Sequence, residues 1–412
     1  MSASATRAVV AALTRNGQTA RFVGGCVRDA VLGREVRDID IATPDPPDAV
    51  IELIEAAGLK AVPTGIAHGT ITAVAESRPF EVTTLRRDVE TFGRHARVAF
   101  TDDWAADAAR RDFTMNALFL NPYGALHGME DGAIFDPTGG LDDARAGRVR
   151  FVGDADARIA EDYLRILRFF RFHAHYGQGA PDATALAACA KHVASLSRLS
   201  GERVRNELLK LLAAPTPGAH VDLMASSGVL AAILPEAGST AALAALALLD
   251  EPRGVADRLR RLASLLDGGS AGAVAERLRL SNAERDRLIA MTAPLPGNLD
   301  LSPGAGIAAH RRALRRLGAA LARDHALLAW ARDRAAVRDE ASGQDALLAT
   351  IAAWKPIAFP LRGADALALG LPPGAAIGRM LGAVETWWEQ GDYRADRAAC
   401  LAELKRLAAE ET

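Results

Sequence analysis

The hydrophobic and polar positions divide the chain into two parts with different periodicities. Up to about residue 145, short apolar runs alternate with turn residues, which predicts strands at residues 21–24, 38–42, 70–75 and 80–85. Residues 49–57 have the spacing of an amphipathic helix that ends at Gly58. From about residue 159 onward, Ala, Leu and Arg dominate with helical spacing, and strand signals vanish. The pattern predicts an α+β N-terminal unit, a small mixed sheet with helices, followed by an all-α C-terminal array.

Length and composition are those of a soluble globular protein with more than one domain. The chain has 412 residues, of which 50% are hydrophobic and 24% are charged, and its formal net charge is −2. A chain of this length is too long for one compact core. Because the overall charge is slightly negative, any nucleic-acid site is expected to be a local patch.

The cysteines and the apolar segments indicate the compartment. Cys26, Cys189 and Cys400 are widely separated, so they match neither a zinc-binding spacing nor a disulfide framework. We therefore expect a cytoplasmic protein. The apolar run near the N-terminus is too short and interrupted for a signal peptide, and no segment is long enough to span a membrane. No protein partner is inferred.

A glycine pair follows the first predicted strand. Gly24 and Gly25 allow a ligand to approach the backbone closely, and the helix predicted to follow offers free N–H groups to a phosphate. Arg28 adds a positive charge that suits phosphate oxygens. An ordinary turn between a strand and a helix has the same appearance, so this feature alone is not decisive.

Two carboxylates in the second predicted strand make the region more informative. Alternate residues of a strand share a face, so Asp38 and Asp40 are expected to lie side by side. Their charges repel unless a cation lies between them, and carboxylate oxygens suit Mg²⁺. Two Mg²⁺ ions are the arrangement used in nucleotidyl transfer. The alternative is an exposed acidic edge strand. Glu81 is a candidate third metal ligand, and equally a candidate surface residue.

Five motifs, in order, resemble those of the class II nucleotidyltransferases, which comprise bacterial and eukaryotic CCA-adding tRNA nucleotidyltransferases and bacterial poly(A) polymerases. The segment from Gly24 to Asp40, GGCVRD followed by DID, resembles the first motif of the family. The other four motifs are similar to residues 110–117 (RRDFTMNA), 136–143 (DPTGGLDD), 161–165 (EDYLR) and 199–203 (LSGER). Residues 363–381 are similar to a C-terminal segment of many bacterial members.

The second motif is expected to bind the nucleotide. Arg111, with Arg110 beside it, can neutralise the charge of a triphosphate. Asp112 and Asn116 are polar groups that could hold a ribose hydroxyl. The two glycines and the proline of residues 136–143 predict a hinge between the sheet and the helices.

The EDYLR motif is expected to read the base. A helix running on from Ala160 would place Asp162 and Arg165 on one face, with Arg168 and Arg171 extending the row. No acidic partners for these last two arginines lie nearby in the sequence, which predicts an anion there. The resemblance assigns Asp162 and Arg165 to the incoming base. The alternative is a surface salt bridge between these two residues.

Residues 85–98 resemble a flexible loop that CCA-adding members need in order to move from C to A addition. Phe92 stands where an aspartate is expected before Gly93, so the acidic character of the segment rests on Asp88 and Glu90. In the helical half, two basic runs, residues 258–261 and 311–316, are candidate phosphate contacts but more typical of solvated helix faces. Binding of tRNA there is expected to depend on shape and charge.

The resemblance implies a Mg²⁺-dependent enzyme that adds C, C and A to the 3′ end of tRNA with CTP and ATP as substrates. It divides the chain into a catalytic head (residues 1–145), a neck that reads the base (146–212), a helical body (213–305) and a tRNA-binding tail (306–412). A poly(A) polymerase or a partial enzyme that adds only CC or only A remains an alternative. A catalytically inactive tRNA-binding protein is another.

Overall fold

The computed structural model of the protein describes residues 3–92, 95–122, 132–337 and 343–410. The chain forms two compact units. One consists of Met1–Ala237 with Arg277–Arg279, and the other of Gly238–Glu276 with Leu280–Thr412.

The first unit contains all the strands of the described residues. They are β1 (Arg21–Val23), β2 (Asp40–Thr43), β3 (Lys60–Gly65), β4 (Thr70–Ala75), β5 (Arg78–Thr84), β6 (Arg86–Phe92), β7 (His95–Phe100), β8 (Phe119–Leu120) and β9 (Ile134–Phe135). Seven of them form one sheet in the order β3-β4-β5-β2-β1-β8-β9, and β6 pairs with β7 in a separate hairpin. The pair β2–β5 is parallel and the other pairs are antiparallel, so the sheet is mixed, as predicted.

Helices of the first unit flank this sheet and continue beyond it. The α-helices are α1 (Ser4–Leu13), α2 (Gly25–Val31), α3 (Pro47–Ala56), α4 (Trp104–Ala109), α5 (Gly140–Ala146), α6 (Ala155–Glu161), α7 (Leu164–Tyr176), α8 (Ala183–Lys191), α9 (Gly201–Leu212), α10 (Pro217–Ser226) and α11 (Val229–Ile233). The 3-10 turns of this unit are η1 (Ile66–His68) between β3 and β4, η2 (Thr114–Asn116) between α4 and β8, and η3 (Val193–Arg198) between α8 and α9.

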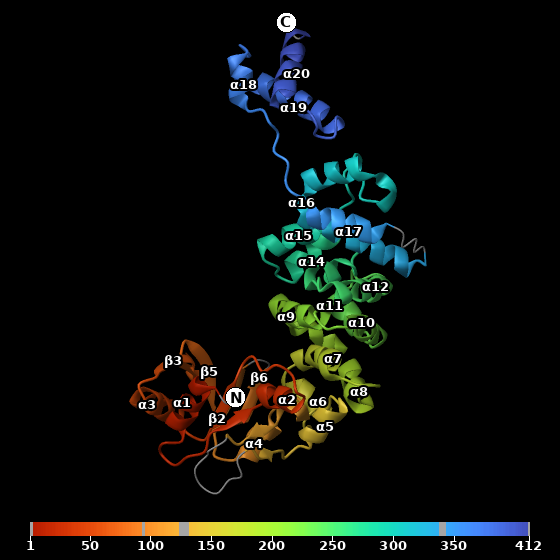
Figure 1. The fold of residues 1–412 in the computed structure, drawn as a ribbon. Coiled ribbons are helices and arrows are strands. Elements are labelled where there is room, and N and C mark those ends of the chain that lie inside the picture. The colour runs from red at the N-terminus through yellow and green to blue at the C-terminus, as the bar shows by residue number, and fades with distance from the viewer. Residues whose placement is uncertain (1–2, 93–94, 123–131, 338–342, 411–412) are drawn as a thin grey trace. The chain divides into compact units, whose positions relative to one another are not determined.

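The two faces of the sheet have different partners, which decides where polar residues can gather. Helices α1 and α3 lie together on one face (Figure 1), and Ile41 of β2 packs into the core that they form. Ala42 belongs instead to the core on the opposite face. Because strand side chains alternate, Asp40 points to the same face as Ala42, away from α1 and α3.

Three expectations about the strands need adjustment. The second strand begins at Asp40 and not at Asp38, so Asp38 lies in the segment that precedes it. Strand β3 was not predicted, because its alternation of exposed and half-buried positions carries little apolar signal. The segment resembling a flexible loop is built from the two strands of the β6–β7 hairpin, and residues 93–94 between them lie outside the described residues.

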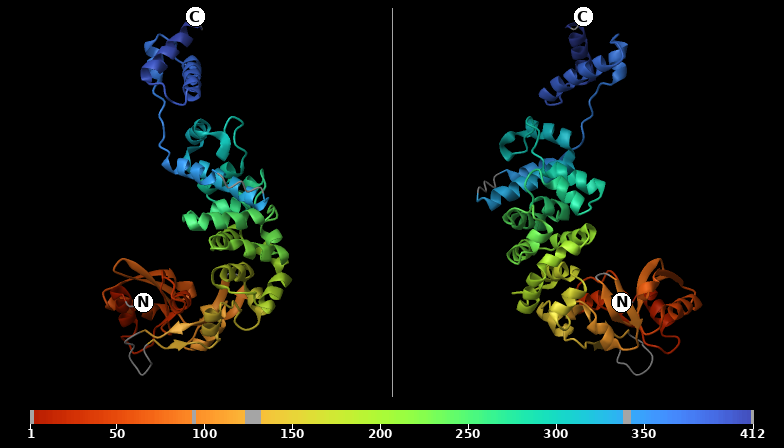
Figure 2. Two further views of the ribbon diagram at one scale, coloured as in Figure 1. Left: turned by 45° about the vertical axis from the view of Figure 1, so that its right-hand side comes forward. Right: turned by 180° about the vertical axis from the view of Figure 1, so that it is seen from behind.

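The second unit is helical throughout its described residues. It contains α12 (Ala241–Asp250), η4 (Glu251–Arg253), α13 (Arg258–Ala263), most of α14 (Ala271–Arg277), α15 (Asn282–Thr292), η5 (Pro303–Ala305), α16 (Ile307–Ala335), α17 (Gln344–Ala353), α18 (Gly363–Ala368), α19 (Ala375–Gln390) and α20 (Arg397–Glu410). Both views of Figure 2 show helices and connecting segments from about residue 155 to the C-terminus. The α+β unit followed by an all-α array is therefore confirmed.

Arginines of both basic runs of the second unit form ion pairs, while Arg258 and Arg316 are exposed. Arg260 and Arg261 are buried, and both bind Asp250. Arg315 and Arg316 both bind Glu389 of α19. The carboxylates balance the positive charges of these four guanidiniums, which makes the arginines poor phosphate contacts.

Two of the apolar clusters in the described residues of the second unit are separate from each other. One centres on α16 and α17 and includes Leu301, while the other begins at Leu361 and includes α19 and α20. The break between the two compact units, after Ala237, falls inside the predicted body, and the four-part division of the chain stays a prediction. Among the described helices, none is both long enough and apolar enough to cross a membrane.

Candidate active site

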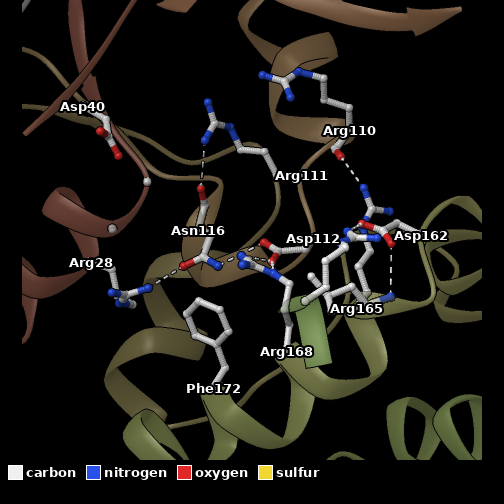
Figure 3. Close-up of a pocket in the computed structure, with 14 residues that line it drawn as sticks. Arg28, Asp40, Arg110, Arg111, Asp112, Asn116, Asp162, Arg165, Arg168 and Phe172 are labelled. Carbon is white, nitrogen blue, oxygen red and sulfur yellow. Dashed lines mark hydrogen bonds and ion pairs between the residues drawn. The ribbon is translucent and has the colours of Figure 1, made fainter. Parts of the chain in front are cut away.

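A cavity of about 550 Å³ in the first unit collects most of the predicted site residues (Figure 3). The residues that line it are Gly24, Gly25, Arg28, Asp40, Arg110, Arg111, Asp112, Asn116, Asp162, Leu164, Arg165, Arg168, Phe172 and Arg203. They come from the β1–α2 turn and α2, from β2, from the segment between α4 and β8, from the break between α6 and α7, and from α7 and α9. Asp38, Glu81 and Arg171 do not line this cavity.

The glycine pair is required by the turn from β1 into α2. Gly24 has φ 75° and ψ −125°, a conformation that side-chain-bearing residues rarely adopt. A Cβ atom on Gly24 would also lie 3.4 Å from Nη1 of Arg111. Gly24 therefore lets the backbone turn tightly and leaves room for an arginine beside it.

Arg28 is held in place by three polar partners. It is buried, with 6% of its surface exposed. Its Nη1 donates to Oδ1 of Asn116 at 2.6 Å, its Nη2 to the Tyr176 hydroxyl at 2.6 Å, and its Nε to Asp29 at 2.9 Å. The guanidinium also lies 4.0 Å from the centroid of the Tyr176 ring. Arg28 is thus a fixed positive charge between the sheet and α7.

A hydrogen-bonded chain continues from Arg28 across the cavity (Figure 3). Nδ2 of Asn116 donates to Asp112 at 3.0 Å, and Nε of Arg168 donates to the other Asp112 oxygen at 2.7 Å. Burial alone would raise the pKa of Asp112. The charge of Arg168, together with the hydrogen bonds that the Asp112 carboxylate accepts, holds that pKa below its ordinary value. Asp112 is therefore an anion at neutral pH. Its proposed contact with a ribose hydroxyl, like that of Asn116, stays a prediction.

Arg110 and Arg111 share one buried carboxylate that the sequence analysis did not single out. Asp107 of α4 is 1% exposed and binds Nη2 of Arg110 at 2.6 Å and Nη2 of Arg111 at 2.8 Å. Burial would raise the pKa of Asp107, but the two arginine charges lower it. The pair of arginines carries one net positive charge beyond this carboxylate, and both side chains reach the cavity.

The EDYLR motif does not form one continuous helix, and that expectation is wrong. Helix α6 ends at Glu161, Asp162 has the extended backbone angles φ −154° and ψ 106°, and α7 begins at Leu164. The break removes the shared helical face on which an Asp162–Arg165 pair was expected. Oδ1 of Asp162 instead accepts from the backbone N–H of Leu164 at 3.1 Å, and its Oδ2 accepts from Arg203 at 2.6 Å.

Arg165 is positioned by other groups. Its Nη1 lies 2.5 Å from Glu161 and 2.8 Å from the carbonyl oxygen of Arg158. Its Nη2 donates to the carbonyl oxygen of Arg110 at 3.3 Å. These contacts use three of the five N–H groups of the guanidinium. Asp162 and Arg165 nevertheless both line the cavity, each held by a separate partner.

The expectation that Arg168 and Arg171 have no acidic partners is also wrong. Arg168 binds Asp112, and Nε of Arg171 lies 2.5 Å from Glu207 of α9. Both carboxylates are distant in sequence and reach α7 only through the tertiary fold. Arg171 therefore supports α7 against α9, and its predicted role in nucleotide binding stays untested.

Asp40 lies near two other carboxylates, those of Glu81 and Asp38. In the parallel pair β2–β5, Asp40 is in register with Glu81, and Asp38 precedes the strand. Burial raises the pKa of Asp40 to about 6, with further contributions from the charges of Glu81 and Asp38 against the opposing charge of Arg111. The negative charge of the Asp40 carboxylate is thus incompletely balanced by positively charged side chains.

The described residues contain no group of three or more acidic, histidine or cysteine side chains placed to hold a metal ion by themselves. Mg²⁺ is commonly held by one or two carboxylates together with water and substrate phosphates. The under-neutralised Asp40, with Asp38 beside it, fits that kind of site. Glu81 is exposed, and its role as a third ligand stays a prediction.

The predicted hinge segment is tied closely to the site. Asp136 accepts hydrogen bonds from the backbone N–H groups of Gly140 and Leu141, and the buried Asp143 accepts one from Thr114 at 2.6 Å. A Cβ on Gly140 would lie 2.0 Å from the carbonyl oxygen of Thr114. Helix α5 and turn η2 therefore touch backbone to backbone, directly beside the second motif.

Sequence reasoning missed Asp107, Arg203, Glu207 and Tyr176 as members of this network. Two signals were available. Asp107 precedes Arg111 by four residues, a spacing typical of ion pairs, although α4 ends at Ala109. Arg203 precedes Glu207 by four residues, which places both on one face of α9. The partners of Arg203 and Glu207 across the neck could not be read from such spacing.

Comparison with known proteins gives consistent matches along the chain. Residues 20–150 match the family model described as "Poly A polymerase head domain", and residues 181–239 match the one described as "Probable RNA and SrmB- binding site of polymerase A". The chain is 34% identical over 408 residues to the mitochondrial CCA tRNA nucleotidyltransferase 1 of Mus musculus, which covers 94% of this chain and 86% of that protein. It is 39% identical to the CCA-adding enzyme of Geobacillus thermodenitrificans over 54% of this chain and 52% of that protein.

Solved structures of CCA-adding enzymes have a similar fold over nearly the whole length of this chain. The CCA-adding enzyme of Bacillus stearothermophilus in complex with CTP has a TM-score of 0.80 at 28% identity, covering 99% of this chain and 98% of that one. The Thermotoga maritima CCA-adding enzyme complexed with tRNA has a TM-score of 0.69 at 22% identity, covering 98% and 94%. The second likeness concerns the fold alone.

Proposed function

The chain belongs to the class II CCA-adding tRNA nucleotidyltransferases, and we infer that it adds C, C and A to the 3′ end of tRNA with CTP and ATP as substrates. The observation that supports this most directly is the single cavity that joins Asp40, the Arg110–Arg111 pair and the Asp162–Arg165 pair. It offers a carboxylate for a metal, cations for a triphosphate and a donor–acceptor pair for a base. A protein that only bound tRNA would not need all three.

Base selection follows from the two groups at the start of α7. Cytosine and adenine both present an exocyclic amine beside an unprotonated ring nitrogen. A carboxylate oxygen of Asp162 can accept from the amine while Arg165 donates to the ring nitrogen. Guanine and uracil present a carbonyl beside an N–H, so acceptor would meet acceptor and donor would meet donor. An unmatched buried polar group costs roughly 1–3 kcal/mol, which is enough to exclude them.

The network around these residues supports such a role because it restricts their movement. Asp162 is held by Arg203, and Arg165 is held by Glu161 and two backbone carbonyls. Preorganised hydrogen-bonding groups discriminate better than mobile ones, since no reorganisation accompanies binding. The carbonyl of Arg110 also connects the arginine that reads the base to the arginines that would face the triphosphate.

The family uses divalent metal ions, and we assign Mg²⁺ to Asp38 and Asp40. When bound, Mg²⁺ would supply positive charge to the reacting phosphate and hydroxyl oxygens. In the reaction, the 3′-hydroxyl of the tRNA releases its proton to water and its oxygen bonds to the α-phosphorus of the nucleotide. The bond from that phosphorus to the pyrophosphate oxygen breaks, and pyrophosphate leaves. Arg110 and Arg111 are placed to stabilise the negative charge that develops on the leaving pyrophosphate.

The test is incubation of the full chain with tRNA lacking its 3′ end, Mg²⁺ and the four nucleoside triphosphates, added singly and together, followed by sequencing of the products. We expect C with CTP alone and CCA with CTP and ATP, and no extension in the presence of EDTA. Long A tracts would identify a poly(A) polymerase, and products ending at CC would identify a partial enzyme. If no nucleotide is added, the protein would be a catalytically inactive tRNA-binding protein. The cytoplasmic location stays a prediction.

A further inference from the structure

The second unit contains a cavity that shares no lining residue with the candidate active site. It measures about 510 Å³, and its lining residues come from the end of α15, the segment after it, η5, the second half of α16 and the start of α17. Helix α16 lines it with Ala326 and Ala329, whose small side chains leave space between the helices. The volume is within the range of pockets that hold small organic ligands.

Gln344, the first residue of α17, lines this cavity with a side chain that lacks a hydrogen-bond partner. Only 7% of the residue is exposed, and its amide forms no hydrogen bond with any described residue. A buried amide without a partner is costly, and native proteins rarely leave one unsatisfied. The amide has both a donor and an acceptor. It therefore suits a ligand that carries an acceptor beside a donor along one edge.

Apolar side chains make up much of the remaining wall. They are those of Pro294, Leu295, Leu301 and Pro303. Among the described residues, no three acidic, histidine or cysteine side chains gather there to hold a metal ion. A nucleobase suits such a wall together with an amide, because its two faces are weakly polar and its edge carries hydrogen-bond donors and acceptors.

Three charged side chains also line the cavity. Arg332 is exposed, Asp333 is half-buried, and neither forms an ion pair within the described ranges of the chain. Asp300 accepts a hydrogen bond from the backbone N–H of Ser302 at 2.7 Å, which lowers the pKa of that carboxyl group and keeps it ionised at neutral pH. Burial lowers the pKa of His325, so its ring adds no charge at pH 7. The cavity thus offers one free cation and two carboxylates.

The charges favour a ligand with one phosphate. The guanidinium of Arg332 suits a phosphate, whereas further phosphates would be repelled by Asp300 and Asp333. Carboxylate oxygens can accept hydrogen bonds from the hydroxyls of a ribose. We propose that this cavity binds a free nucleoside monophosphate, with the edge of the base at Gln344 and the phosphate at Arg332. Because the amide of Gln344 can turn over and exchange its donor and acceptor, the site accepts more than one base.

Photo-crosslinking of the full-length protein tests the proposal at this cavity alone. The probe is 8-azidoadenosine 5′-monophosphate, and the attached peptides are identified after irradiation. We expect attachment within residues 292–303 or 325–333, suppressed by excess AMP and not by excess ribose 5-phosphate, which lacks the base. Attachment only at residues that line the candidate active site would overturn the proposal. Suppression by tRNA and not by AMP would assign the cavity to a nucleotide of RNA and would overturn the proposal of a free ligand.

Two variants test the roles of the amide and of the space. Gln344→Leu removes the amide, and Gln390→Leu is its control, at an exposed glutamine of α19 that does not line the cavity. We expect the probe concentration for half-maximal attachment to rise about tenfold in Gln344→Leu and to stay within twofold in Gln390→Leu. Ala329→Leu, at an exposed position of α16, should fill the cavity and abolish attachment.

The stability of Gln344→Leu provides a readout that does not depend on the probe. Because the amide has no partner among the described residues, its loss should leave the denaturation midpoint at or above that of the wild type. A lower midpoint, or unchanged probe affinity in both Gln344→Leu and Ala329→Leu, would overturn the proposal. None of these measurements depends on nucleotide addition, so their outcome is separate from that of the proposed function.

Discussion

Nη2 of Arg203 lies 2.6 Å from Oδ2 of Asp162, although 41 positions separate the two residues in the sequence. Asp162 stands in a break between two helices, and Arg203 reaches it from α9. The carboxylate proposed to recognise the base is thus oriented by an arginine from the final motif of the family. This contact, and not an Asp162–Arg165 salt bridge, fixes the orientation of the Asp162 carboxylate.

We expect Arg203→Ala to reduce the preference for C over U in the first addition by about tenfold, because Asp162 would lose the partner that orients it. Asp162→Ala should reduce that preference at least as much. The measurement is the set of kcat/KM values for the four nucleotides. Arg205→Ala is the control, since Arg205 lies on the same helix and outside the cavity. An unchanged C-to-U ratio in both cavity variants would return Asp162 and Arg203 to a structural role.

Replacing Asp40 with Asn keeps the size of the side chain and removes the charge proposed to hold Mg²⁺. We expect incorporation of both C and A to fall by on the order of a thousandfold, with tRNA affinity within about twofold of wild type. Asp48→Asn, at an exposed position of α3, should have wild-type activity. Transfer and tRNA binding are measured separately, by product sequencing and by filter binding. Incorporation within a few-fold of wild type in Asp40→Asn would exclude the metal assignment.

Asp107 orients both Arg110 and Arg111, so its loss should affect every nucleotide alike. We expect Asp107→Asn to raise the KM values for CTP and ATP together by about tenfold, with the ratio among the four nucleotides unchanged. Steady-state kinetics with each nucleotide gives both quantities. A change in base preference would show instead that the two arginines contact the base.

Gly140 is expected to be intolerant of any side chain. Gly140→Ala places a Cβ 2.0 Å from a backbone carbonyl, and should destabilise the first unit by on the order of 3 kcal/mol. Gly382→Ala is the matched control. Gly382 also lies in a helix, α19, with open space around it, so alanine there should stabilise by up to about 1 kcal/mol. Chemical denaturation of the wild type, Gly140→Ala and Gly382→Ala measures both the expected loss and the expected gain in the free energy of unfolding. Equal midpoints for Gly140→Ala and wild type would contradict the close contact of α5 with η2.

His173 should make the stability of the first unit depend on pH. Burial, and then the nearby His220, lower the pKa of His173 from 6.5 to about 4, and neither ring nitrogen has a hydrogen-bond partner among the described residues. Between these two pH values the unfolded chain binds a proton that the folded chain does not. The contribution of neutral, buried His173 to the free energy of unfolding is therefore complete above about pH 6.5. It is lost as the pH falls toward 4.

The matching experiment is chemical denaturation of wild type and His173→Phe at pH 7.5 and pH 5. From pH 7.5 to pH 5, the free energy of unfolding of the wild type should fall by about 2 kcal/mol more than that of the variant, because phenylalanine does not titrate. The comparison of the two differences cancels the contribution of the other groups. An equal loss in both proteins would mean that His173 titrates alike in the folded and unfolded chain.

Local features of the fold followed from the sequence because they depend on neighbouring residues. Strand β4 appears at the predicted residues, and α3 within two residues of its predicted ends, since alternation and helical spacing are properties of short segments. The tight turn at Gly24 could also be predicted from the sequence, because few residues other than glycine adopt such a backbone conformation. The break at Asp162 was not recognisable, since EDYLR contains no proline or glycine and its spacing suits a continuous helix.

The sequence by itself determined the family, the α+β and helical halves, and the identity of most residues in the cavity, because motif order and periodicity are written along the chain. The tertiary structure decided which charges neutralise one another. Asp112, Asp107 and Glu207 each bind arginines, and the pairs Asp112–Arg168 and Glu207–Arg171 join residues more than thirty positions apart. Ion pairing depends on separation in space, and only packing of α7 and α9 against the segment after α4 brings these groups within hydrogen-bonding distance.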